Sequence, residues 1–257
     1  MRCSTNFRFA MLVGTSILFL GAVLALAQTG LAPSVPATVT STPPPVIVIG
    51  FVGGFIEPDN LVHSEVQLAA RLRKAYPMGV DVETFGSHPG KKAEQKVLSL
   101  LGTNHDGPLT LKEKQNARII IYGHSWGGSE AIVLARELQK DGIPVLLTIQ
   151  VDSVSKLHQN DAIIPANVAQ AANFFQPHGL LHGQPEIRAA DPAHTRIIGN
   201  FQFDYKGNAY KCEGYPWYDR FFVKSHTQIE CDPNVWKQAE GLIRSELPAG
   251  TASQAEK

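Results

Sequence analysis

Short apolar runs that alternate with helical segments constrain the fold of this chain more than any other feature. The runs are rich in β-branched residues or alternate apolar with polar side chains, and they cover 46–49, 80–85, 118–122, 144–151 and 197–203. Segments with apolar residues at helical spacing cover 60–76, 92–101, 125–140 and 234–247. Strands that alternate with helices favour an α/β fold with a mostly parallel sheet and helices on both faces. Functional sites in such sheets lie beyond the carboxyl ends of the strands.

The N-terminal part differs in composition from the rest of the chain. Two arginines precede an apolar run that ends in small residues, which is the order found in a cleavable signal peptide. We therefore expect 1–27 to be a signal peptide and the protein to be exported, either periplasmic or secreted; a single membrane anchor is the alternative. Residues 28–45 are rich in Pro, Ser and Thr and predict a linker. The remaining residues, 46–250, suit one domain with a sizeable core.

The charge of the chain argues against one class of partner. It has 23 basic and 23 acidic residues, so its formal net charge is zero. A nucleic-acid-binding surface needs a clustered excess of Lys and Arg, and we therefore expect no nucleic-acid partner. Contact with a membrane is expected only through an uncleaved signal segment.

The cysteines predict a disulfide in the mature protein. Cys3 would leave with the signal peptide, so Cys212 and Cys231 remain as an even pair. Disulfides persist in exported proteins. A bridge here closes a loop of about 20 residues and stabilises by about 3 kcal/mol on chain-entropy grounds. Two unpaired buried thiols are the alternative.

The sequence GHSWGG at 123–128 places a serine where a predicted strand runs into a predicted helix. The G-x-S-x-G spacing around Ser125 is weak by itself, so its context decides. A turn from strand to helix in so few residues needs a strained backbone and small flanking residues, which Gly123, Gly127 and Gly128 supply. Such a turn lifts the hydroxyl above the sheet edge at the positive end of a helix. We therefore predict Ser125 as a nucleophile; a structural serine in a tight turn is the alternative.

With these features the chain resembles the α/β-hydrolase family. The resemblance rests on the serine turn at 123–128, the glycine-rich loop at 50–54, an acid after the next strand and a late histidine, and it covers most of 46–246. It implies a triad in the chain order Ser, Asp or Glu, His. It also implies esterase, lipase or related acyl-transfer chemistry on a small-molecule ester or acyl substrate. That chemistry requires no metal or organic cofactor.

The candidates for the triad base are the histidines that follow the acid, namely His158, His178, His182, His194 and His226. His226 lies in a loop before the last predicted helix, as the base of the family usually does, and we expect it to activate the serine. A surface histidine is the alternative. His178 and His182 have an i,i+4 spacing that could indicate metal ligands. Because glycines interrupt that stretch and the ligands are too few, we expect a loop pair there.

The acid of the triad should orient the histidine and stabilise its charged form. Asp152 follows the buried strand 144–151, one helix and one strand after the serine. Strands joined by a short crossover usually lie side by side, so we expect its carboxylate to emerge near Ser125. Asp161 and Asp204 remain alternatives. Asp204 is the more serious of the two because the acid of the family more often follows a later strand.

Two backbone amides should hold the developing oxyanion. We expect one to be the amide of Trp126 and the other to come from the loop at 50–54, with Phe51 as the first choice and Val52 as the next. The loop departs from the His-Gly-Gly-Gly motif that the family often carries. It also does not match the G-x-G-x-x-G pattern of a dinucleotide site, so we expect no nucleotide.

Residues 153–196 are polar and interrupted by prolines, which predicts a small cap or extended loops over the site. The aromatic residues at 214–222 indicate either core packing or an apolar wall for the acyl group. Together these features predict an exported serine hydrolase that cleaves carboxylic esters through an acyl-enzyme. An acyltransferase or thioesterase on the same triad, or a binding protein that kept the fold, are the alternatives.

Overall fold

The structure of the chain is a computed structural model, and it describes residues 44–87, 91–102, 107–207 and 210–248. The expected signal peptide and nearly all of the expected linker lie outside the described residues. All described residues belong to one compact unit, Thr42–Lys257. No helix within the described ranges is long and apolar enough to cross a membrane.

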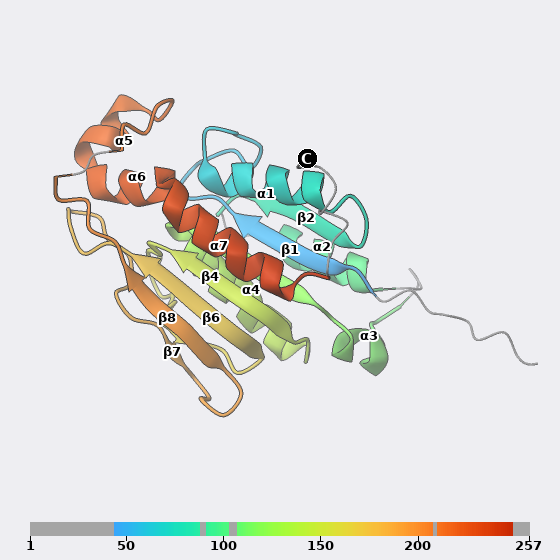
Figure 1. Cartoon of the computed structure of the whole chain (residues 1–257). Coiled ribbons are helices and arrows are strands. Elements are labelled where there is room, and N and C mark those ends of the chain that lie inside the picture. Colours follow the sequence, from blue (N-terminus) through green and yellow to red (C-terminus); the bar gives the residue numbers. More distant parts are fainter. Residues whose placement is uncertain (1–43, 88–90, 103–106, 208–209, 249–257) are drawn as a thin grey trace, which may run out of the picture. The chain divides into compact units, whose positions relative to one another are not determined.

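Six strands of the described part form one parallel sheet in the order β2–β1–β3–β4–β6–β8 (Figure 1). Their bounds are β1 Val46–Phe51, β2 Val80–Phe85, β3 Ile119–His124, β4 Val145–Val151, β6 Val168–Phe175 and β8 Arg196–Gln202. Every residue of β1 and β3 is buried. Such continuous apolar strands are typical of a parallel sheet that helices cover on both faces.

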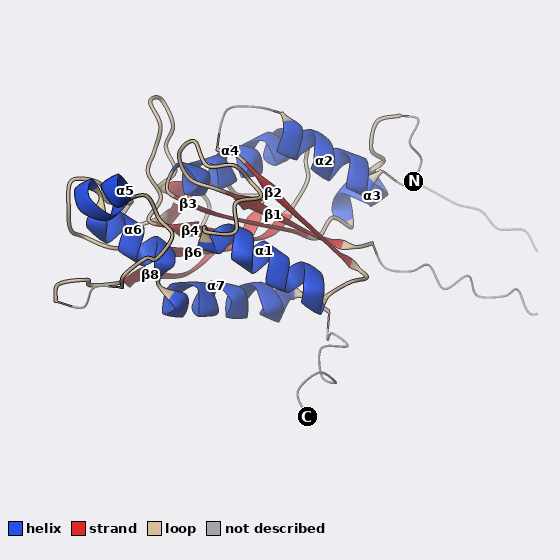
Figure 2. Cartoon of the chain, turned by 90° about the horizontal axis from the view of Figure 1, so that it is seen from above, coloured by secondary structure: helices blue, strands red, loops and turns tan. Residues whose placement is uncertain are grey.

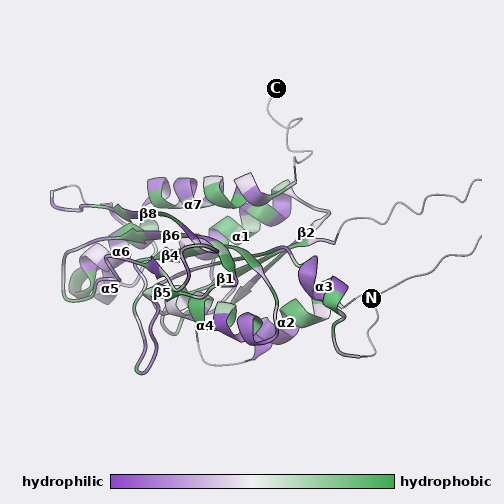
Figure 3. Ribbon diagram, turned by 90° about the horizontal axis from the view of Figure 1, so that it is seen from below, coloured by the Kyte–Doolittle hydropathy of each residue, from purple (hydrophilic) through white to green (hydrophobic). Residues whose placement is uncertain are grey.

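Helices pack on both faces of this sheet (Figure 2). One hydrophobic cluster joins α1 (Ser64–Ala75) and α7 (Pro233–Glu246) to one face, and a second joins α2 (Lys92–Leu101) and α4 (Trp126–Lys140) to the other. Successive residues of β1 alternate between the two clusters, as side chains of a strand must. Figure 3 shows apolar residues along the strands and mixed polar and apolar faces on α2 and α7. The predicted fold class is confirmed.

The largest difference from the sequence prediction is strand β6, which lies within the stretch expected to form a cap or loops. β6 lies between β4 and β8 in the sheet and pairs with both. Its alanines and amide side chains hide the strand pattern, although Ala171, Ala172 and Phe174 are fully buried. The insertion after β4 is therefore two loops on either side of β6. They carry the short paired strands β5 (Ile163–Ile164) and β7 (Arg188–Ala189).

A second difference concerns the stretch before the last helix, which was expected to be a loop. It holds two short helices, α5 (Trp217–Phe222) and α6 (Lys224–Cys231), beside the ends of the strands where their arrowheads point in Figure 1. A disulfide joins Cys212 to Cys231, with a Cα–Cα distance of 5.5 Å, as predicted. It ties the end of α6 to the segment that precedes α5. A third short helix, α3, covers Leu111–Gln115.

Candidate active site

Ser125 lies in a strained turn between β3 and α4. Its φ of 56° and ψ of −126° fall outside the regions that a serine ordinarily adopts. A Cβ at Gly123 would lie 2.3 Å from the carbonyl oxygen of Gly127, and a Cβ at Gly127 would lie 2.3 Å from that of Phe51. Only glycine fits at these two positions. The backbone of this sequence therefore holds the serine at the carboxyl end of the sheet.

The structure brings Ser125, His226 and Asp152 together. Nε2 of His226 is 2.8 Å from Oγ of Ser125, and Nδ1 of His226 is 2.6 Å from Oδ2 of Asp152. The serine comes from the β3–α4 turn, the histidine from α6 and the aspartate from the residue after β4. A proton on Nδ1 facing the carboxylate leaves the lone pair of Nε2 toward the serine hydroxyl. In this arrangement the imidazole can take the proton of the serine.

Other groups hold the Asp152 carboxylate in place. Oδ1 accepts hydrogen bonds from the amides of Gly183 at 2.8 Å and Gln176 at 3.2 Å, and Oδ2 accepts one from Nε2 of Gln176 at 2.9 Å. A Cβ at Gly183 would lie 2.3 Å from the carbonyl carbon of Asp152, so this position also requires glycine. Neither Gln176 nor Gly183 was predicted, because the strand that ends just before Gln176 was not recognised.

The alternative acids and bases lie elsewhere. Asp161 is buried and accepts hydrogen bonds from the hydroxyls of Ser153 and Ser155. The Asp204 side chain is 53% exposed and lies 3.4 Å from Nε2 of His178. Among the described residues, neither member of the His178–His182 pair belongs to a group of side chains that converges on a possible metal position.

The expected oxyanion donors occupy different positions relative to Ser125. Trp126 is the first residue of α4, where an amide has no acceptor within its own helix. Phe51 instead lies inside the sheet as the last residue of β1, paired with both Phe85 and Gly123. The amide of the next choice, Val52, donates to the carbonyl of Phe85 at 3.0 Å. These positions suit neither Phe51 nor Val52 for binding an oxyanion.

Gly53 and Gly54 come closer to the serine than Phe51 does. Both line the same cavity as Ser125, and a Cβ at Gly53 would lie 3.1 Å from the Cβ of Ser125. The amide of Gly53 points to Oε1 of Glu65 at 3.3 Å. This contact engages the amide of Gly53 with a buried carboxyl group.

The cavity over Ser125 and His226 has a volume of about 270 Å³. Apolar side chains of Ile56, Leu181 and Val223 form part of its wall. Of the side chains that the structure describes in the aromatic stretch 214–222, only Asp219 lines the cavity. Trp217 and Phe221 are largely exposed, and Tyr215 is buried. Among the described side chains, the aromatic acyl wall that was one of the two interpretations of this stretch does not line this cavity.

Four buried polar side chains adjoin the triad, and the sequence did not predict them. The pKa of Glu65 is raised to about 8, mainly by burial and next by the nearby carboxyl of Glu230. Burial also raises the pKa of Glu230 to about 8. Burial lowers the pKa of His63, and burial together with the nearby His226 holds the pKa of His124 well below its ordinary value. The rings of His124 and His226 pack at a centroid distance of 4.6 Å. The imidazoles of His63 and His124 therefore favour the neutral form.

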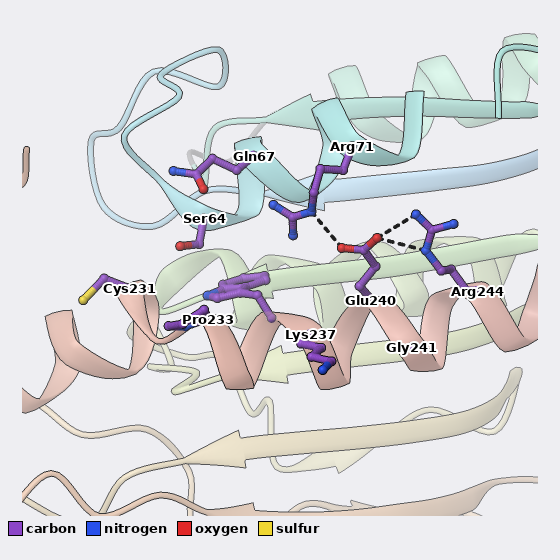
Figure 4. Close-up of a pocket in the computed structure, with 10 residues that line it drawn as sticks. Ser64, Gln67, Arg71, Cys231, Pro233, Lys237, Glu240, Gly241 and Arg244 are labelled. Atoms are coloured by element: carbon purple, nitrogen blue, oxygen red, sulfur yellow. Dashed lines mark hydrogen bonds and ion pairs between the residues drawn. The ribbon is translucent and has the colours of Figure 1, made fainter. Parts of the chain in front are cut away.

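A larger cavity of about 610 Å³ lies between α1 and α7, away from the triad (Figure 4). Figure 4 shows Arg71 and Arg244 pointing at the carboxylate of Glu240. They donate to it at 2.8 and 2.7 Å. Because these charges satisfy one another and no triad residue lines the cavity, the smaller cavity over Ser125 is the candidate active site.

Comparisons with known proteins give only remote similarity. Neither a family model nor a curated protein matches the sequence. An acetylxylan esterase structure is 13% identical with a TM-score of 0.38, and the match covers 80% of this chain and 100% of that one. ClbQ from the colibactin NRPS/PKS pathway is 14% identical with a TM-score of 0.35, over 78% and 98% of the two chains. The RedJ thioesterase of the prodiginine biosynthetic pathway in Streptomyces coelicolor is 12% identical with a TM-score of 0.33, over 76% and 98%. The function of this chain therefore has to come from the geometry of its own site.

Proposed function

We propose that this protein is a serine hydrolase that cleaves carboxylic esters through an acyl-enzyme. The observation that carries the proposal is the pair of hydrogen bonds that link Ser125 to His226 at 2.8 Å and His226 to Asp152 at 2.6 Å. A serine hydroxyl is a weak nucleophile until a base takes its proton, and this chain of contacts supplies the base and its orienting acid. The strained turn at Ser125 supports the same role.

In the proposed reaction, Oγ of Ser125 attacks the acyl carbon while Nε2 of His226 takes the hydroxyl proton. Asp152 stabilises the imidazolium that forms. As the tetrahedral intermediate collapses, His226 gives this proton to the alcohol that leaves, and the acyl group stays on Ser125. A water molecule then gives its proton to His226 and attacks the acyl-enzyme. When the second intermediate collapses, the acid leaves and Ser125 regains a proton.

The oxyanion of each intermediate is held by two amides in this proposal, those of Trp126 and Gly54. Trp126 starts α4, so its N–H is one of the donors that a helix leaves free and lies at the positive end of the helix. Gly54 lines the cavity with Ser125, whereas Phe51 is held inside the sheet. Gly54 therefore replaces Phe51 as the second proposed donor.

The size of the cavity favours short acyl groups. Its volume of about 270 Å³ lies near the lower end of the range for ligand pockets, roughly 300–1,000 Å³. Ile56, Leu181 and Val223 provide an apolar surface of limited length. We propose acetyl to butyryl esters as the preferred substrates, and we propose that the protein works after export, in keeping with its disulfide.

Covalent labelling tests the proposal. A fluorophosphonate should add to the purified protein at Ser125, and peptide mass mapping should find the adduct there. Hydrolysis should be measured on p-nitrophenyl esters from acetate to palmitate, with Ser125→Ala as the control. Absence of any labelling of folded protein would favour a binding protein. Faster transfer of the acyl group to an added alcohol than to water, or a strong preference for thioesters, would favour the acyltransferase or thioesterase alternative.

A further inference from the structure

Four side chains from three elements converge next to the triad. His63 and Glu65 come from the start of α1, His124 ends β3, and Glu230 lies on α6. Ligand atoms of His63, Glu65 and Glu230 all lie within 4.8 Å of one another. Nδ1 of His124 lies 3.4 Å from Oε2 of Glu230 and 4.0 Å from Oε1 of Glu65. The cluster is therefore built from both nitrogen and oxygen donors.

The two carboxyl groups of this cluster are buried without a cationic side chain. The side chain of Glu65 is fully buried and that of Glu230 is 8% exposed. Among the described residues, no lysine or arginine forms an ion pair with either group. Oε2 of Glu65 is buried and has no hydrogen-bond partner in the same part of the chain. Buried carboxyl groups are costly in the charged form unless they are paired or bind a cation, and otherwise they keep their protons. A metal cation that displaces these protons would satisfy both groups.

The spacing of the donor atoms fits a tetrahedral metal ion. With bonds of about 2.1 Å, the ligand atoms of tetrahedral zinc lie about 3.4 Å from one another. The separations in the cluster lie on both sides of this value. They are 2.6 Å between His63 Nδ1 and Glu230 Oε1 and 4.0 Å between His124 Nδ1 and Glu65 Oε1, and the ligand atoms of His63, Glu65 and Glu230 all lie within 4.8 Å of one another. Within His63, Glu65 and Glu230, changes of no more than about 1.4 Å in these separations would give the tetrahedral spacing. The hydroxyl of Tyr215 donates to Oε1 of Glu230 at 3.1 Å and orients that carboxylate.

We propose that His63, Glu65, His124 and Glu230 form a binding site for one Zn²⁺ ion. Imidazole nitrogens and carboxylate oxygens are both zinc ligands, and two carboxylates balance the charge of the ion. The ion displaces the protons that the carboxyl groups of Glu65 and Glu230 carry, and these protons leave to solvent. The cavity over Ser125 provides an entry path, because His63, His124 and Glu230 line it.

The site lies beside the triad and not within it. Glu230 follows His226 by four residues on α6, so both project from one face of that helix. His124 immediately precedes Ser125. A zinc ion here would join α6, which carries the proposed base, to α1 and to the end of β3. Its role is to position α6, and the ion takes no part in the proposed reaction.

Metal stoichiometry of the protein, purified without a polyhistidine tag, tests the site. After equilibrium dialysis against buffered Zn²⁺ and mass spectrometric metal analysis, we expect about one zinc per chain. Glu65→Gln and Glu230→Gln should each weaken binding by at least about 10- to 100-fold. Glu240→Gln is the matched control, because its carboxylate lies between arginines outside the cluster, and it should bind like the parent. Zinc should also raise the midpoint of thermal unfolding of the parent but not of Glu65→Gln.

Binding of Co²⁺ to the parent protein gives a second readout that needs no variant to fold. We expect the intense visible absorption of four-coordinate cobalt, and Zn²⁺ should abolish it. All measurements should be repeated in Ser125→Ala, so that failure of the proposed hydrolase function would leave the result intact. Folded parent protein that binds no stoichiometric metal, cobalt in a six-coordinate site, or unchanged zinc affinity in folded Glu65→Gln would overturn the inference.

Discussion

Replacing Asp152 by asparagine should abolish turnover through the tautomer of His226 and leave the fold in place. Oδ1 of Asp152 accepts hydrogen bonds from the backbone amides of Gly183 and Gln176, and neither amide can become an acceptor. The carboxamide oxygen of an asparagine must therefore stay at this position. Its NH₂ group then takes the place of Oδ2, which lies 2.6 Å from Nδ1 of His226 and accepts from Nε2 of Gln176 at 2.9 Å. The Gln176 amide loses its acceptor there, and the NH₂ group also faces Nδ1 of His226. To avoid two opposed donors, His226 must put its proton on Nε2, facing Ser125.

A histidine with its proton on Nε2 cannot accept the proton of the serine. Loss of the corresponding aspartate in the Ser-His-Asp enzymes of known mechanism lowers kcat about 10⁴-fold, which corresponds to roughly 5.5 kcal/mol at 1.36 kcal/mol per tenfold step. We expect a loss of the same order in kcat for p-nitrophenyl acetate. Stability should change by only about 1–3 kcal/mol, the usual range for one mismatched buried polar group.

The matched control is Asp204→Asn, because Asp204 is the exposed alternative acid and lies beside His178. It should keep kcat within a few-fold of the parent. Circular dichroism and thermal unfolding should show that both variants fold. The assignment of the acid would be refuted if Asp152→Asn kept its turnover and folded Asp204→Asn lost it. Ser125 and His226 would then need another acid as partner.

Three further changes test the rest of the site. Ser125→Ala should fold normally, should not be labelled by a fluorophosphonate, and should have a kcat lower by at least about 10³-fold. Labelling at another residue would contradict the proposed nucleophile. Replacing Cys212 and Cys231 together by alanine should lower the free energy of unfolding by about 3 kcal/mol in chemical denaturation, and an unchanged value would argue against the bridge. Gly183→Ala should lower both kcat and stability because its Cβ would lie 2.3 Å from the carbonyl carbon of Asp152. Gly241 lies on α7, and nothing lies within 4 Å of a Cβ added there. Gly241→Ala should therefore lower neither kcat nor stability.

Most of the fold could be predicted because its strands carry strong local signals. Strand β2 has the predicted bounds, and β1, β3 and β4 differ from prediction by one or two residues at either end. The start of α1 was placed four residues too early, since the stretch 57–63 forms turns closed by the carbonyl of Glu57 and the side chain of Asn60. Strand β6 escaped recognition because packing against its neighbours, and not its own sequence pattern, makes Val168–Phe175 a strand.

The placement of Ser125 and Asp152 was predictable because chain order maps directly onto neighbouring parallel strands. β3 and β4 pair with one another, so the residues that follow them emerge at the same edge. The proposal for the second oxyanion donor moved from Phe51 to Gly54 because strand β1 extends beyond the predicted run 46–49 and includes Phe51. Sequence alone does not show where a strand stops, and the choice between Phe51 and Gly54 depends on that boundary.

The cluster next to the triad left a signal that only a correct helix assignment would reveal. In the sequence HTQIE, His226 and Glu230 have the i,i+4 spacing that puts two side chains on one face of a helix. Because this stretch was expected to be a loop, the i,i+4 spacing did not indicate that the two side chains lie together. Once α6 is present, the base and a buried carboxylate necessarily share a face, and any ion bound by Glu230 also fixes the position of His226. The proposed zinc site and the proposed triad therefore depend on the same turn of α6.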